Sequence, residues 1–246
     1  MTLPDGLDAA LSAFAARRPL LVASDYDGVL APLVGDPSDA VPEAGAAEAL
    51  GRLAGIDGVT VAIVSGRGVA DLQATSGLTG PFRWVGSHGA EFDGPLAGDL
   101  AARRDALAER LAPAVSRVPG ARLEVKPASV AVHVREVPDR AAAAALLDEA
   151  RSLADSSLTL KPGKEVLELA VTDADKGSAL LRLAADLGAV ATLYLGDDVT
   201  DEDAFRVLGE DDVTVKIGDG ETAAAHRLPD TAAAVGLLDR LGALLS

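Results

Sequence analysis

Two aspartates stand two positions apart at the end of a short apolar run. Asp25 and Asp27 lie directly after the apolar run 19–24, and Gly28 follows them. In an extended strand, residues i and i+2 point to the same side, so the two carboxylates would share one pocket. Such a pair suits phosphoryl transfer, because one carboxylate can attack phosphorus while the other protonates the leaving oxygen and later deprotonates water. An acidic turn after a strand is the alternative interpretation.

Three further polar groups follow apolar runs or open helices later in the chain. Ser65 and Arg67 could donate to phosphoryl oxygens, although a serine in this position could instead cap a helix. Lys176 opens a predicted helix whose positive end would help it hold an anion, with a merely exposed lysine as the alternative. The run GDDVTDED at 196–203 concentrates carboxylates whose repulsion a cation would offset, and helix capping leaves its first two aspartates unexplained.

These side chains need strands that end at the same edge of a sheet. Short apolar runs predict strands, and alanine-rich stretches with helical spacing predict helices between them. The predicted strands are 19–24, 59–64, 82–85, 189–195 and 212–217, and the helices include 42–53 and 176–187. Alternation of this kind is typical of an α/β fold with a doubly wound, Rossmann-like parallel sheet, which binds ligands beyond the carboxyl ends of its strands.

The stretch 94–171 has a different pattern, typical of a smaller α+β unit with an antiparallel sheet. Its predicted elements are helices at 99–116 and 139–153 and strands at 122–126, 130–135, 158–160 and 165–170. We therefore expect a core domain formed by 1–93 and 172–246, with 94–171 inserted into it. Glu124 and Lys126 share one face of a predicted strand and suit sugar hydroxyls, although an exposed cross-strand ion pair would give the same pattern.

Composition narrows the possible partners. The chain has 246 residues, a formal net charge of −16, no cysteine and three histidines. The negative charge disfavours nucleic acid and anionic membranes, and the lack of cysteine and histidine directs attention to oxygen ligands, which suit magnesium. With neither a visible secretion signal nor a long apolar span, we expect a soluble, cytoplasmic protein with a small-molecule substrate, as a monomer.

The order of these signals resembles the haloacid dehalogenase phosphatase superfamily, and the insertion looks like the cap that those enzymes carry. Seven segments are more specific: DYDGVLAPL, SGR, GSHGAEF, LEVKPASVAVHVR, GKEVLEL, DKGSAL and GDDVTDEDAF. Over Leu20 to Phe205 they resemble the trehalose-6-phosphate phosphatase family. The resemblance implies Mg²⁺-dependent hydrolysis of trehalose 6-phosphate through an aspartyl phosphate, the final step of trehalose biosynthesis. One departure is Val29, where the family usually has threonine, although the wider superfamily accepts valine there.

The resemblance also implies roles for individual residues. Asp25 would be the nucleophile and a magnesium ligand, and Asp27 the acid/base and, through its carbonyl, a second ligand. Asp197 would complete the metal site with Asp201 behind it, while Ser65 and Lys176 would hold the phosphate. The inserted domain would bind the sugar through Glu124, Lys126, Lys164 and Glu168. Further candidates for substrate contact are Arg67, Arg135 and His88, while His133 and His226, the latter in a late loop, are expected to be structural.

Three alternatives to this function remain at the level of sequence. A related phosphatase could act on sucrose or glycosylglycerate phosphates, and only the inserted domain's residues argue against it. A catalytically silent sugar-phosphate-binding or regulatory module would be expected to lack the nucleophile or the acid/base, and both Asp25 and Asp27 are present. A phosphotransferase such as a mutase would use the same core chemistry with a sugar hydroxyl in place of water.

Overall fold

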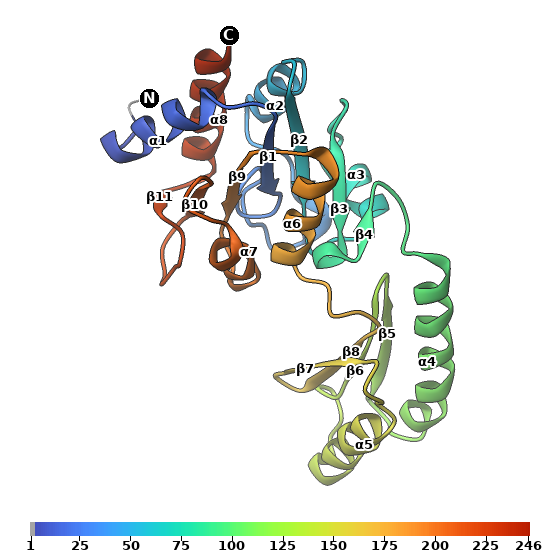
Figure 1. Cartoon of the computed structure of the whole chain (residues 1–246). Coiled ribbons are helices and arrows are strands. Elements are labelled where there is room, and N and C mark those ends of the chain that lie inside the picture. Colours follow the sequence, from blue (N-terminus) through green and yellow to red (C-terminus); the bar gives the residue numbers. More distant parts are fainter. Residues whose placement is uncertain (1–2) are drawn as a thin grey trace. The chain divides into compact units, whose positions relative to one another are not determined.

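A central parallel sheet carries the residues that the sequence singles out. The computed structural model describes residues 3–246, and the strand order is β11-β10-β9-β1-β2-β3-β4. All neighbouring strands are parallel except β3 and β4 (Figure 1). The strands are β1 (Leu20–Asp25), β2 (Val59–Val64), β3 (Arg83–Gly86), β4 (Glu91–Phe92), β9 (Ala191–Gly196), β10 (Val213–Ile217) and β11 (His226–Leu228). This arrangement confirms the predicted α/β fold with a parallel-sheet core.

Helices cover both faces of this sheet. One face packs against α1 (Asp5–Ala15), α2 (Ala46–Ala54), α3 (Val69–Ser76) and α8 (Thr231–Leu245), and the other against α6 (Lys176–Leu187) and α7 (Glu202–Val207). Alternate residues of β1 serve the two cores: Leu20 and Val22 face the first, and Leu21 and Ala23 the second. A strand buried on both sides must be apolar throughout, which explains the continuous hydrophobic run in the sequence.

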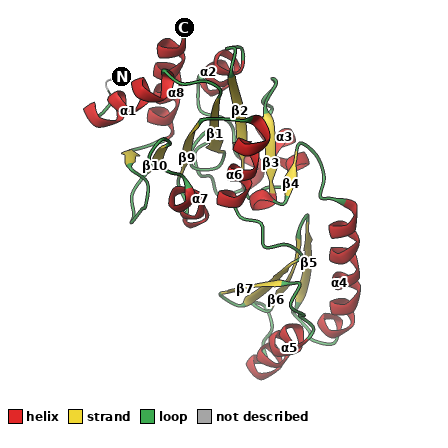
Figure 2. Cartoon of the chain, viewed as in Figure 1, coloured by secondary structure: helices red, strands yellow, loops and turns green. Residues whose placement is uncertain are grey.

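The chain folds into two compact units. The first contains the parallel sheet, runs to Gly94 and resumes at Ala174, and the second is Pro95–Asp173. The second unit has an antiparallel sheet of order β5-β6-β8-β7, formed by β5 (Arg122–Lys126), β6 (Ser129–His133), β7 (Thr159–Gly163) and β8 (Val166–Ala170). Its helices are α4 (Gly98–Ser116) and α5 (Arg140–Ser152) (Figure 2). Both pack on the sheet, α4 against β5 and β6 and α5 against β8.

The described elements differ from the sequence prediction in a few places. Helix α2 begins at Ala46 rather than at residue 42, because the amide of Glu43 donates to the carbonyl of Leu30 (2.7 Å) and ties this segment to a loop. His226, expected in a loop, lies on β11, where it pairs with Val215 of β10. This strand has three residues, too few to form an apolar run that predicts a strand.

Helices α1 and α8 were also not predicted. They pack against each other and against the sheet, and the apolar side chains of α1 at Leu7, Leu11 and Phe14 are buried. Their spacing of four and three residues is the helical signal that could have found α1. None of the helices in the described chain combines the length and apolarity needed to cross a membrane.

Candidate active site

The candidate site lies where the sheet changes its winding direction. The chain passes from β1 to β2 on one side and returns to β9 on the other side of β1. Doubly wound sheets bind ligands at the carboxyl ends of the strands that flank such a point. A pocket of about 760 Å³ opens here in the first unit, and its lining includes all seven site residues predicted for the parallel-sheet core: Asp25, Asp27, Ser65, Arg67, His88, Lys176 and Asp197.

A buried ammonium joins two of the carboxylates. Lys176 is the first residue of α6, which begins with a capping box between Asp175 and Ser178. Its Nζ donates to Oδ2 of Asp25 (2.5 Å) and to Oδ1 of Asp201 (2.8 Å), and only 2% of the residue is exposed. Lys176 is therefore not the exposed lysine of the alternative interpretation. It provides a fixed positive charge beside the first carboxylate of the DYDG motif.

Asp201 lies behind the pocket and is fully buried. Its Oδ1 also accepts from the hydroxyl of Tyr194 (2.5 Å), while its Oδ2 accepts from the backbone amides of Asp197 and Asp198 (2.9 Å each). With the bond from Lys176, four donors converge on this one carboxylate. Asp201 is thus tied to the strand-end loop and to the ammonium, and it fixes the position of both.

Burial and charge oppose one another at this cluster. Burial raises the pKa of Asp25, with a further contribution from the charge of Asp201, although Lys176 opposes both. Burial would likewise raise the pKa of Asp201, but Lys176 and the other donors hold it below its ordinary value. Burial alone would lower the pKa of Lys176, but the charges of Asp25 and Asp201 raise it, so the ammonium stays protonated. The net direction for the pKa of Asp25 is upward, so the positive charge of Lys176 offsets only part of what burial costs its carboxylate form, the form that could attack phosphorus.

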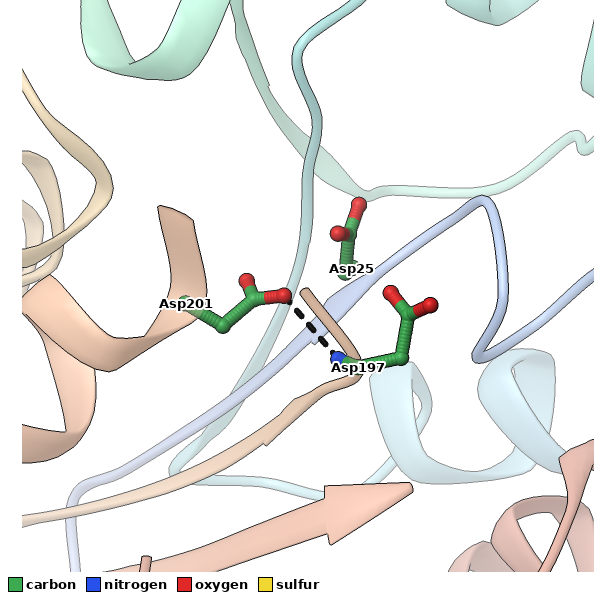
Figure 3. Close-up of side chains that lie close together, drawn as sticks. All are labelled: Asp25, Asp197 and Asp201. Atoms are coloured by element: carbon green, nitrogen blue, oxygen red, sulfur yellow. Dashed lines mark hydrogen bonds between the residues drawn. The ribbon is translucent and has the colours of Figure 1, made fainter. Parts of the chain in front are cut away.

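Asp25, Asp197 and Asp201 bring carboxylate oxygens within 4.8 Å of one another (Figure 3). Burial, followed by the charge of Asp201, raises the pKa of Asp197 to about 6, so this carboxylate is destabilised where it lies. Oxygen donors of this kind fit a hard divalent cation. Because the oxygens of Asp201 accept four hydrogen bonds, Asp25 and Asp197 are the better placed side chains to bind it.

Asp27 shares the pocket with Asp25 but has a different partner. Both of its oxygens accept from Arg67, Oδ2 from Nε (2.7 Å) and Oδ1 from Nη2 (2.8 Å). The side chain of Asp27 is 32% exposed, and that of Arg67 is 11% exposed. The two aspartates of the motif are therefore held separately, one by a buried lysine and one by a partly buried arginine. Val29, two residues on, is fully buried in the first core and packs there.

Ser65 follows β2 and does not cap a helix. Helix α3 begins four residues later, and the Oγ of Ser65 accepts from the backbone amide of Arg67 (3.1 Å). The backbone carbonyl of Ser65 accepts from the amide of His88 (3.0 Å). Ser87 and His88 both have left-handed φ values, 50° and 56°, which are uncommon for residues with side chains and which often mark functional turns. This strained turn places His88 at the pocket.

The predicted sugar-binding residues lie in the second unit. Glu124 and Glu168 both pair with Ala131 of the strand between them, so they are on the same face of the sheet. Lys126 donates to Glu168 (2.6 Å), which also accepts from Ser129 (2.7 Å). Burial would raise the pKa of Glu168, but these donors lower it. Lys164 is exposed in the turn between β7 and β8, and Arg135 is exposed beyond β6, 3.9 Å from Glu165.

A family model described as trehalose-phosphatase matches residues 23–229. The chain belongs to the trehalose-phosphatase family. The trehalose-phosphate phosphatases of Mycobacterium marinum and Mycobacterium avium are 35% and 38% identical to it over 266 and 265 residues. These alignments cover 99% and 97% of this chain but 67% and 66% of the relatives, so the chain spans about two thirds of their length.

Solved structures of this family share the fold as well. The Aspergillus fumigatus trehalose-6-phosphate phosphatase superimposes with a TM-score of 0.77 at 26% identity, over 96% of this chain and 97% of that one. The likeness therefore covers both units of the chain. It supports the predicted combination of a parallel-sheet core with an inserted α+β unit.

Several polar residues that support the trehalose-phosphatase site were not predicted from the sequence. Lys216 on β10 is buried, and its ammonium contacts the backbone carbonyl of Asp197. A lysine inside the β-branched VTVKI strand was a signal that could have found it. Tyr194, which donates to Asp201, has no comparable signal because aromatic residues are common in buried strands. His133, expected to be structural, lies 2.7 Å from Glu124 on the polar face of the second unit's sheet.

Proposed function

We propose that the chain hydrolyses trehalose 6-phosphate to trehalose and inorganic phosphate, the final step of trehalose biosynthesis. The observation that carries this proposal is the convergence of Asp25, Ser65, Lys176 and Asp197, from four separate segments, on one pocket. Family membership supports the reaction class, and similarity to trehalose-phosphate phosphatases supports the substrate.

The chemistry proceeds in two steps. A carboxylate oxygen of Asp25 attacks phosphorus, the bond from phosphorus to the sugar oxygen breaks, and Asp27 gives its proton to that oxygen. Asp27 then takes a proton from water, which attacks the aspartyl phosphate to release inorganic phosphate and restore Asp25. The Ser65 hydroxyl and the Lys176 ammonium hold the phosphoryl oxygens through both steps. The distance of 2.5 Å between Lys176 and Asp25 supports this role, since the ammonium already lies beside the attacking group.

The donor set fits magnesium. Asp25, the backbone carbonyl of Asp27 and Asp197 would hold the ion, and Asp201 would position the loop that carries Asp197 through its bonds to two backbone amides. When bound, magnesium would offset the negative charge of the carboxylates and of the phosphate. The raised pKa of Asp197, about 6, supports this assignment, because a destabilised carboxylate gains from a cation.

The second unit would recognise the sugar. Glu124, Lys126, Lys164 and Glu168 offer the acceptors and donors that sugar hydroxyls require. Arg135 of the same unit and His88 of the first unit are further candidate contacts. The ion pair between Lys126 and Glu168 supports a shared polar face rather than scattered surface charges. Paired groups of this kind can exchange their partners for hydroxyls without leaving a charge unsatisfied.

The test measures phosphate release from trehalose 6-phosphate, sucrose 6-phosphate and glucose 6-phosphate, with and without magnesium. We expect preference for the trehalose ester and dependence on the metal. Preference for another sugar phosphate would replace the substrate while keeping the chemistry, and release only in the presence of an acceptor sugar would indicate a phosphotransferase. Asp25→Asn should remain folded but inactive; activity comparable to the parent would exclude the aspartyl phosphate.

A further inference from the structure

Arg67 lies in the pocket wall, where an arginine could bind the phosphate directly. Its guanidinium instead forms a fork on Asp27, with Nε and Nη2 each donating to a different carboxylate oxygen at 2.7 and 2.8 Å. A planar guanidinium and a planar carboxylate joined by two bonds fix each other's orientation as well as their distance. The carboxylate of Asp27 is therefore aimed by Arg67.

The remaining donors of Arg67 are also largely occupied by the protein. Nη2 donates to the carbonyl of Pro37 (2.6 Å) and Nη1 to Oδ2 of Asp71 (3.1 Å). Four of the five N–H groups of the guanidinium thus have protein acceptors. These bonds connect three segments of the first unit: the end of β1, the loop around Pro37 and the first turn of α3. To bind a phosphate with two donors, Arg67 would have to release at least one of these acceptors.

We propose that Arg67 is a positioning residue that acts through Asp27 rather than a ligand of the phosphate. The inference rests on the proposed function, because it takes Asp27 as the group that exchanges protons. When Asp27 carries a proton on one oxygen, its other oxygen can still accept from the guanidinium. Arg67 therefore holds the side chain in place in both protonation states, and a displaced Asp27 would miss the sugar oxygen or the attacking water.

The test compares Arg67→Ala and Arg67→Lys with the parent on trehalose 6-phosphate. Loss of positioning should lower kcat by about 10- to 100-fold, with KM changed by less than about threefold, since a displacement of about 1 Å at a reacting group can cost about 100-fold. Lysine keeps the charge but not the fork, so Arg67→Lys should resemble Arg67→Ala more than the parent. Arg83→Ala, which breaks an exposed arginine–aspartate pair with Asp93, is the matched control and should keep the parent's kcat.

Two further measurements separate the two roles even if the variants lose some stability. Inorganic phosphate should inhibit Arg67→Ala and the parent with inhibition constants within about threefold, because the phosphoryl site is intact in both. In an Asp27→Asn background, Arg67→Ala should cost less than about threefold, because the residue through which it acts has been removed.

A phosphate inhibition constant raised by about tenfold or more would overturn the proposal, since each good contact to an anion is worth that much. Equal losses in the parent and the Asp27→Asn backgrounds would overturn it too. If the parent prefers another phosphate ester, the same cycle is run with that ester, so failure of the substrate assignment and failure of this inference are distinguished. A parent that hydrolyses no ester would overturn both.

Discussion

Gly28 shows how closely the residues of the site are packed. Its φ is +79°, in the left-handed region, and a Cβ added there would lie 2.0 Å from Oδ2 of Asp197. The turn after β1 therefore depends on glycine for its backbone conformation and for the space that Asp197 occupies. A larger residue must displace the carboxylate that we assign to the metal. The absence of a side chain at Gly28 therefore lets the acidic loop after β9 pack directly against the DYDG motif.

Substitution of Gly28 tests this link. Gly28→Ala should lower kcat by about 100-fold and weaken magnesium activation, because the added methyl group would displace the Asp197 carboxylate by about 1 Å or more. Gly188→Ala is the matched control, since Gly188 is also left-handed, with φ +62°, but has no atom within 4 Å of an added Cβ. It should lose about 1 kcal/mol of stability from the backbone conformation and keep its activity. Both are assayed by magnesium titration and thermal unfolding; similar activity in the two variants would contradict the argument.

At the scale of the element, local patterns determined what could be predicted. Helix α6 begins at Lys176 and ends at Leu187, as predicted, because Asp175 caps its start and Gly188 ends it. The strands β1, β2, β3, β9 and β10 were predicted because burial on both faces demands a run of apolar residues. The short strands β4 and β11 carry no such run and were not predicted; their places depend on pairing with β3 and β10. Apolar patterns in a sequence indicate buried elements, so an element without a buried apolar run cannot be predicted from them.

The hydrogen-bond partners of charged side chains could not be predicted from the sequence either. Arg67 was predicted as a candidate substrate contact and lines the pocket, but its bonds to Asp27 and to the carbonyl of Pro37 join residues 40 and 30 positions apart. No periodicity relates such positions. The positions of residues at strand ends predicted which side chains lie at the same edge of the sheet. The hydrogen bonds between those side chains depend on side-chain geometry.

Glu168 on β8 makes a prediction about pH. Burial opposes its charge, but Lys126 and Ser129 hold its pKa below the ordinary value of 4.5. A depressed carboxyl pKa contributes stability above the ordinary value, and that contribution is lost as the pH falls through the folded-state pKa. Glu168→Gln should therefore lower the free energy of unfolding near pH 7, and its difference from the parent should shrink below about pH 4.5.

Urea unfolding followed by circular dichroism at several pH values measures this difference. Glu109→Gln replaces an exposed glutamate on α4 of the same unit and should show no comparable trend. If the difference between the parent and Glu168→Gln is constant from neutral to acidic pH, the ion pair with Lys126 does not determine the protonation of Glu168.

At the scale of the whole molecule, the negative charge raises the question of how an anionic substrate is bound. The chain carries a formal charge of −16, and its proposed substrate is an anion. Lys176, Arg67 and Lys216 place three positive charges at or beside the acidic pocket. Arg67 uses four of its five N–H groups on protein acceptors, and Lys216 is not among the residues that line the pocket. Lys176 lines the pocket and keeps one N–H beyond its bonds to Asp25 and Asp201, so it would attract the phosphate together with a divalent cation.

Metal removal tests whether a cation is needed to bind the anionic substrate. EDTA should abolish turnover and magnesium should restore it, because the pocket without the cation repels the substrate. Asp197→Ala should raise the magnesium concentration needed for half-maximal activity by about tenfold or more, the loss expected when a direct ligand is removed. Asp203→Ala, which removes an exposed carboxylate on α7, should shift it far less. Full activity after exhaustive chelation would remove the metal from the mechanism.

The division of the chain into two units predicts that chemistry and specificity can be separated. The first unit contains every residue assigned to the phosphoryl group, and such a site is largely indifferent to what carries the phosphate. The second unit contains Lys126, Lys164 and Glu168, which we assign to the sugar and whose hydrogen bonds to its hydroxyls a poorly fitting sugar would not form. Each charged hydrogen bond that is lost costs about 1–3 kcal/mol, or roughly 10- to 100-fold in kcat/KM.

Replacing each of these three residues by alanine should therefore lower kcat/KM for trehalose 6-phosphate by about 10-fold or more. The same variants should lose much less activity on p-nitrophenyl phosphate, which has no sugar hydroxyls to bind. Glu109→Ala, an exposed change on α4, should leave the ratio of the two activities at the parent's value. Proportional losses on both substrates in all three variants, or a parent that prefers sucrose 6-phosphate, would show that these residues do not select trehalose. A selective loss would instead assign substrate choice to the second unit, since the residues that handle the phosphate are unchanged in every variant.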